Sequence, residues 1–143
     1  MGMKGTGVFS GGVGAVQLSK PSGGGTSITV SFGAAHNPLV AWSAYCTSKA
    51  AVHHLNACLD KEYAAQGIRA LILSPGTVAT QMQRDIKASG MNPVARMEWE
   101  EHIPPEWPAK TLVWMCSTDA DDHLGQVVSL RDDNIRRRVG LIA

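Results

Sequence analysis

The order of two short apolar segments around one long helical segment constrains the fold of this chain most strongly. Residues 26–32 are rich in β-branched side chains and follow three glycines, which is typical of a strand. Residues 44–66 contain no proline or glycine and favour a helix, with Ser43 as its predicted N-cap and Gly67 as its stop. Residues 68–73 form a second apolar strand. Because no hairpin separates the two strands, the pattern predicts parallel pairing and an α/β fold.

The rest of the chain supplies fewer elements. Residues 1–25 are glycine-rich and have a weak preference for either helix or strand. Residues 81–89 predict a looser helical piece and residues 106–116 a further helix, with an irregular, proline-containing stretch between them. Residues 126–130, after Gly125, predict a third strand. We therefore expect about three parallel strands with flanking helices.

Composition excludes several classes of protein. The 143 residues suit one domain, and a net charge of +1 provides no basic field for nucleic acid. No apolar run approaches the roughly 20 residues that a membrane span needs, and residues 1–9 lack the apolar core of a secretory signal. The cysteines Cys46, Cys58 and Cys116 form no CxxC pair, and the histidines show no metal-ligand spacing. We expect free thiols, no metal site and a cytoplasmic location.

Tyr45 and Lys49 are the clearest candidates for chemistry. They are four residues apart, so on a helix they lie on one face, about one turn from each other. A phenol with a pKa near 10 is a poor acid at neutral pH, and a nearby ammonium group is expected to lower that pKa. Such a pair can protonate a carbonyl oxygen or deprotonate an alcohol. Taken alone, YxxxK also occurs by chance on a helix surface.

The context of this pair resembles the short-chain dehydrogenase/reductase family. The segment YCTSKAAV at residues 45–52 follows one strand and precedes a second that ends in LSPGTVAT at residues 73–80. This order and spacing is similar to the family's YxxSK and PGxxxT block, and the likeness extends over about residues 22–130. Within the family, the segments WSAY (42–45), TQMQ (80–83) and GQVVS (125–129) resemble the sepiapterin reductase and benzil reductase branch.

The resemblance implies a function and a site. The fold would be an incomplete, Rossmann-like, doubly wound parallel sheet, and the activity an NAD(P)-dependent reduction of a small carbonyl compound or oxidation of an alcohol. The branch favours NADP over NAD. Tyr45 would be the acid–base residue, and Lys49 would lower its pKa and hold the nicotinamide ribose. Four residues would line the nicotinamide: Pro75, Gly76, Val78 and Thr80. Residues 81 to about 105 would cover the substrate, and the helix bearing Tyr45 would join copies into a homo-oligomer.

The chain departs from the family pattern in three places. The family has a serine thirteen residues before the tyrosine, where this chain has Phe32; Ser31 is adjacent, but neighbouring residues of a strand face opposite sides. No asparagine occupies the position expected in the preceding helix. The segment TGVFSGGVG at residues 6–14 approaches the nucleotide-binding pattern TGxxxGxG, yet no strand precedes it, so we expect it not to bind phosphate.

These departures leave two hypotheses. We divide the chain into a glycine-rich remnant of the preceding helix region (1–25), a catalytic half (26–130) and a solvated basic tail (131–143) that carries Arg136, Arg137 and Arg138. In the first hypothesis the chain is the catalytic half of an oxidoreductase and is inactive alone. In the alternative it is a non-catalytic, truncated relative that acts only through helix-mediated association.

Overall fold

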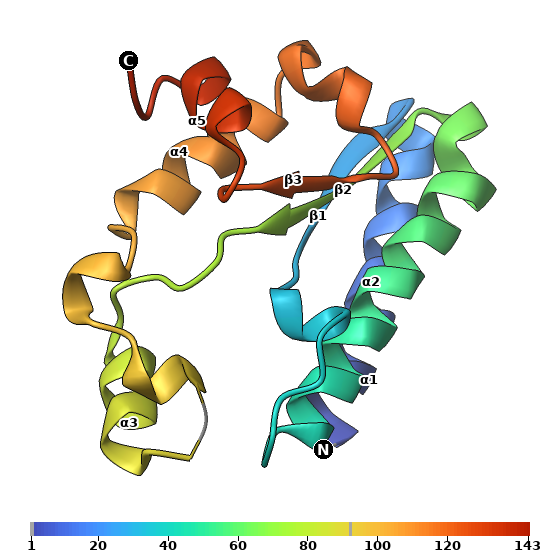
Figure 1. Ribbon diagram of the computed structural model, residues 1–143. Coiled ribbons are helices and arrows are strands. Elements are labelled where there is room, and N and C mark those ends of the chain that lie inside the picture. The colour runs from blue at the N-terminus through green and yellow to red at the C-terminus, as the bar shows by residue number, and fades with distance from the viewer. Residues whose placement is uncertain (1, 92) are drawn as a thin grey trace.

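The computed structural model describes residues 2–91 and 93–143 and has a parallel sheet at its centre (Figure 1). The strands are β1 (Gly25–Val30), β2 (Ile68–Ser74) and β3 (Val127–Ser129), in the order β1-β2-β3. Both pairings are parallel. The predicted α/β architecture with three parallel strands is therefore confirmed.

Helices cover both faces of this sheet. α1 (Gly2–Ser19) and α2 (Ser43–Tyr63) lie on one side, and α4 (Glu106–Met115) and α5 (Asp133–Val139) on the other (Figure 1). Successive β2 side chains alternate between two cores, as a strand requires. Ile68 and Ala70 pack with residues of α1 and α2, whereas Leu71 and Leu73 pack with residues of α4 and α5. β2 is consequently buried on both faces, like the central strand of an α/β sheet.

The glycine-rich segment is more regular than its composition predicts. Residues 2–19 form α1, although glycine costs about 1 kcal/mol in a helix relative to alanine. Packing against α2 offsets this cost, because Val16 is buried with Leu59, and Gly12 lies close to the Leu59 and Leu55 side chains. The TGVFSGGVG segment lies inside this helix and has no strand-to-helix turn within it.

Several predicted boundaries need correction. The first strand ends at Val30 rather than Phe32, so Ser31 and Phe32 lie beyond it. The long helix begins at Ser43, and Trp42 holds the N-cap position without a side-chain cap, so the prediction of Ser43 as N-cap is wrong. Gly67 stops this helical segment in a left-handed conformation (φ 80°), as predicted. A Cβ there would lie 2.7 Å from the Gly23 carbonyl oxygen.

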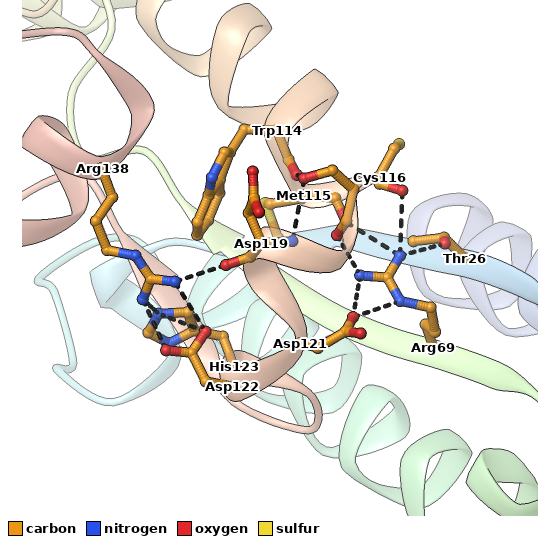
Figure 2. Close-up of polar contacts among 11 residues, drawn as sticks. Thr26, Arg69, Trp114, Met115, Cys116, Asp119, Asp121, Asp122, His123 and Arg138 are labelled. Carbon is orange, nitrogen blue, oxygen red and sulfur yellow. Dashed lines mark hydrogen bonds and ion pairs between the residues drawn. The ribbon is translucent and has the colours of Figure 1, made fainter.

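The prediction of a solvated basic tail at the C-terminus is wrong. Residues 133–139 form α5, and two of its arginines bind the body of the protein. Arg138 donates to the Asp122 carboxylate at 2.7 Å and to the Asp119 carbonyl at 2.6 Å (Figure 2). Arg136 Nε donates to the Leu130 carbonyl at 2.6 Å. The run of arginines therefore stabilises the fold locally, because Asp122 and the backbone carbonyls offer acceptors within reach.

Arg69 of β2 ties three parts of the chain together. Its guanidinium donates to Asp121 Oδ1 at 2.6 Å, to Thr26 Oγ1 at 2.7 Å and to the Ser117 carbonyl at 2.7 Å (Figure 2). These acceptors belong to β1 and to the turns that follow α4. Charge-assisted bonds of this kind are stronger than neutral ones, so Arg69 fixes the end of α4 to the sheet.

Candidate functional site

A cleft lies between the first turns of α2 and helix α3 (Gln81–Ser89), at the carboxyl ends of β1 and β2. This is where open α/β sheets bind their ligands. The cleft has a volume of about 130 Å³. Every site residue that the sequence singled out lines it, together with the phenylalanine at the expected serine position: Ser31, Phe32, Tyr45, Lys49, Pro75, Gly76, Val78 and Thr80.

Tyr45 and Lys49 lie one turn apart on α2, as their spacing predicts. Lys49 Nζ is 5.7 Å from the centroid of the Tyr45 ring and donates to the Val30 carbonyl at 2.9 Å. Two aromatic rings meet the Tyr45 ring edge-on, Trp42 at 5.3 Å and Phe32 at 6.2 Å between centroids. The Tyr45 ring is thus in contact with the Lys49 ammonium group and with two aromatic rings.

The pKa of Tyr45 moves in the direction opposite to the one expected from the sequence. Burial raises it above its ordinary value of 10.0, and the adjacent Cys46 raises it further. Lys49 lies over the ring and donates to the Val30 carbonyl, and the net direction of the Tyr45 pKa is upward. The phenol is therefore protonated at neutral pH, which is the state that can donate a proton.

Ser31 and Phe32 both face the cleft, although neighbouring strand residues would point apart. Because β1 ends at Val30, the alternation of a strand no longer governs this pair. The Ser31 backbone N–H still donates to the Leu73 carbonyl at 2.8 Å, which anchors the segment to β2. The Ser31 side chain is 4% exposed, and its hydroxyl has no hydrogen-bond partner among the described residues.

The turn after β2 is built by one glycine and one isolated bridge. Gly76 has φ 77°, a left-handed conformation that favours glycine. Ile103 pairs with this segment, donating to the Thr77 carbonyl and accepting from the Ala79 N–H. Val78 lies between the two residues that bond Ile103. Because successive residues of an extended segment point their backbone groups to opposite sides, the N–H and carbonyl of Val78 point away from Ile103.

The sequence predicts that residues 81 to about 105 cover the substrate, but it singles out none of the individual apolar and amide side chains that complete the cleft. Trp42 served only as a marker of the family branch. Gln83 and Ile86 are three residues apart on α3 and face the cleft together. A helical plot of residues 81–89 would have placed these two on one face. The remaining lining residues are Val30 and Met82.

The sequence matches the family described as short chain dehydrogenase over residues 2–90. The chain belongs to this family. It is 33% identical to the benzil reductase ((S)-benzoin forming) of Saccharomyces cerevisiae over 122 residues, covering 78% of this chain and 46% of that protein. It is 31% identical to the benzil reductase of Bacillus cereus over 104 residues, covering 64% of this chain and 41% of that protein. The predicted likeness to the benzil reductase branch is confirmed.

Solved structures agree with this assignment. A short-chain dehydrogenase/reductase from Mycobacterium ulcerans has a TM-score of 0.69 at 25% identity, covering 81% of this chain and 43% of that one. Acetoin dehydrogenase from Salmonella typhimurium has a TM-score of 0.65 at 26% identity, covering 81% and 47%. The chain thus spans less than half the length of these relatives. Within the described residues, no helix has both the length and the apolar character to cross a membrane.

Proposed function

We propose that this chain carries the catalytic half of an NAD(P)-dependent oxidoreductase that reduces a small carbonyl compound. The observation that supports it most is the meeting of Tyr45 and Lys49 with the turn from Pro75 to Thr80 in one cleft. These are the residues to which the family resemblance gives chemical roles. The benzil reductases and the dihydroxybenzoate dehydrogenase of Escherichia coli, 42% identical over 66 residues, are named for reactions of carbonyl and alcohol groups.

In the proposed reaction, Tyr45 donates its phenolic proton to the carbonyl oxygen of the substrate. The residues from Pro75 to Thr80 would hold a nicotinamide, which would supply the hydride to the carbonyl carbon, so that one hydride and one proton would convert the carbonyl to an alcohol. Lys49 stabilises the phenolate left on Tyr45, since its ammonium group is the nearest described cation over the ring. Because its pKa is raised above its ordinary value, the Tyr45 phenol is protonated before the reaction but is a weak acid, so proton transfer depends on stabilisation of the phenolate by Lys49.

Ser31 is proposed to hold the substrate oxygen. Its buried hydroxyl has no partner among the described residues and lines the same cleft as Tyr45. A donor placed at the oxygen that gains charge stabilises the transition state. Phe32, which replaces the expected serine, would instead contact an apolar part of the substrate.

The nicotinamide end of the cofactor fits the described residues, and the nucleotide end does not. The backbone groups of Val78 are outside the bridge to Ile103, and the Thr80 side chain makes no capping bond, so both can meet a carboxamide. Lys49 would hold the ribose. The glycine segment at residues 6–14 is helical and offers no phosphate loop. We propose either NAD or NADP, with NADP favoured by the family branch.

Association through α2 is also proposed, as part of this function. The comparisons give no support to the alternative of a non-catalytic association module. A groove beside α2 is lined by Phe9, Leu55, Leu59 and Tyr63, and Phe9 is 56% exposed. We propose a homo-oligomer in the cytoplasm, a compartment that the three free cysteines suit. Light scattering at micromolar concentration should give a mass above 15.2 kDa; a monomer would contradict this association.

The function is tested at donor concentrations high enough to offset the missing nucleotide half, for want of which the chain is expected to be inactive alone at ordinary cofactor concentrations; carbonyl reduction is followed with NADH, NADPH and reduced nicotinamide mononucleotide, which lacks the adenosine half. The three donors should support similar rates, because the described residues contact only the nicotinamide end. Tyr45→Phe should lower the rate by about 100-fold or more, as expected for loss of a general acid. Tyr63→Phe, on the same helix but outside the cleft, is the control. No reduction with any donor, or full activity in Tyr45→Phe, would overturn the proposal.

A further inference from the structure

Helix α3 buries one residue, and that residue is polar. Gln83 is 9% exposed, whereas every other residue from Gln81 to Ser89 is less buried. The buried position of a surface helix is ordinarily apolar. Figure 1 shows α3 beyond the end of β2, and among the described residues none of α3 belongs to either hydrophobic core. It lines the cleft that contains Tyr45.

The amide oxygen of Gln83 lacks a hydrogen-bond partner. Oε1 is fully buried, and no described residue donates to it. The backbone N–H of Gln83 donates to the Thr80 carbonyl at 3.0 Å, so the residue is fixed in the first turn of the helix. A buried acceptor without a donor is costly unless something else supplies one. By contrast, Gln81 on the same helix donates to Asp85 at 2.9 Å and is exposed.

The missing donor is best supplied by the substrate. The other residues of α3 that line the cleft, Met82 and Ile86, have apolar side chains and offer no donor. Gln83 lines the same open cleft as Tyr45, which has a volume of about 130 Å³. A substrate that enters this cleft to meet Tyr45 can therefore bring a donor to Gln83.

We propose that Gln83 is a specificity-determining residue that accepts a hydrogen bond from a substrate hydroxyl on the carbon next to the reacting carbonyl. The inference rests on the proposed function, in which Tyr45 meets the carbonyl oxygen. It names the substrate class as α-hydroxy ketones, with the apolar remainder of the molecule against Phe32 and Trp42. A site built to bind a hydroxyl discriminates against the analogue that lacks it, because its buried acceptor is then left unpaired.

The test compares two ligands that differ by one hydroxyl, phenacyl alcohol and acetophenone, with the full chain and reduced nicotinamide mononucleotide. Calorimetry should give a Kd for phenacyl alcohol about tenfold below that for acetophenone, the preference that one hydrogen bond supplies. Gln83→Leu should remove this preference, so that the two ligands bind with similar Kd. Gln81→Leu, the matched control on the same helix, should keep the preference. Gln83→Met provides a second, unbranched variant if the leucine disturbs packing.

Each outcome decides the inference. Equal affinities in the wild-type chain, or a preference that survives in both Gln83 variants, would overturn it. Reduction of acetophenone by the same preparation tests the proposed function separately, since acetophenone needs only Tyr45. If acetophenone is reduced but the hydroxyl makes no difference, the role of Gln83 fails and the proposed function stands. If neither ligand binds or is reduced, both fail.

Discussion

The cleft and the region around Arg69 and Arg138, called here the arginine-rich end of the sheet, treat polar side chains in opposite ways. At the arginine-rich end, all three guanidinium nitrogens of Arg69 donate to acceptors from β1 and the turns after α4. In the cleft, Ser31 Oγ and Gln83 Oε1 are buried without partners among the described residues. At the arginine-rich end, the polar groups form hydrogen bonds that stabilise the fold. The cleft leaves its polar groups available, which is what a ligand site requires.

A third buried polar atom without a partner among the described residues lies outside the cleft. Asn56 is fully buried on α2, and its Nδ2 also has no partner among the described residues. Its Oδ1 accepts a hydrogen bond from Thr29 of β1 at 3.3 Å, and it does not line the cleft. An unpaired atom alone therefore does not identify a site. Ser31 and Gln83 differ from Asn56 because they line a cleft that also contains Tyr45 and Lys49, and on that combination the proposed site rests.

The largest expected effect is on the stability of the arginine-rich end. Arg69→Met removes the bonds to Asp121, Thr26 and the Ser117 carbonyl, and should lower the free energy of unfolding by about 2 kcal/mol. Urea unfolding followed by circular dichroism measures the change. Arg137→Met, an exposed arginine on α5, is the control and should change stability little. Equal, small effects of the two substitutions would break the contrast.

Two buried hydroxyls offer a smaller but sharper comparison. Thr111 Oγ1 is buried and donates to the Trp107 carbonyl at 2.8 Å, whereas the Ser31 hydroxyl has no described partner. Thr111→Val should lower the free energy of unfolding by about 1 kcal/mol. Ser31→Ala should leave it unchanged or raise it, because it removes an unpaired polar group. A loss of more than about 1 kcal/mol in Ser31→Ala would show that this hydroxyl is already bound within the fold.

The smallest effect concerns alkaline pH. Because the folded-state pKa of Tyr45 lies above its unfolded value near 10, the folded chain holds the phenolic proton more tightly. This contribution to stability is complete below the unfolded pKa and is lost as the pH rises through the folded pKa. Wild type should therefore lose stability relative to Tyr45→Phe as the pH rises above about 10. Urea unfolding of both proteins across that range measures the difference, and a constant difference would contradict the raised pKa.

Much of the fold follows from local sequence. The β-branched run before Val30, the uninterrupted helix after Ser43 and the stop at Gly67 predict the strand–helix–strand unit, and the structure has it. α1 could not be predicted with the same ease, because its stability comes from Val16 and Gly12 packing on α2 rather than from helix propensity. The arginines of α5 looked like a tail because their acceptors, among them Asp122, lie elsewhere in the chain.

In the candidate site, too, some features follow from the sequence and others depend on tertiary contacts. The motif residues from Tyr45 to Thr80 come together in the cleft as the family resemblance implies. The direction of the Tyr45 pKa was missed, because burial by Phe32 and Trp42 depends on tertiary contacts that a YxxxK spacing does not encode. The orientation of Ser31 was missed because the alternation argument assumed a strand that continues to Phe32.

The central claim is that the cleft beside Tyr45 binds the nicotinamide while the arginine-rich end does not take part. The most direct measurement is a titration of the ¹⁵N-labelled chain with reduced nicotinamide mononucleotide, followed by backbone amide shifts. We expect saturable shifts at Ser31, Val78 and Thr80, and none at Arg69 or Asp121. Shifts that are absent from the cleft, or that gather around Arg69, would contradict the account.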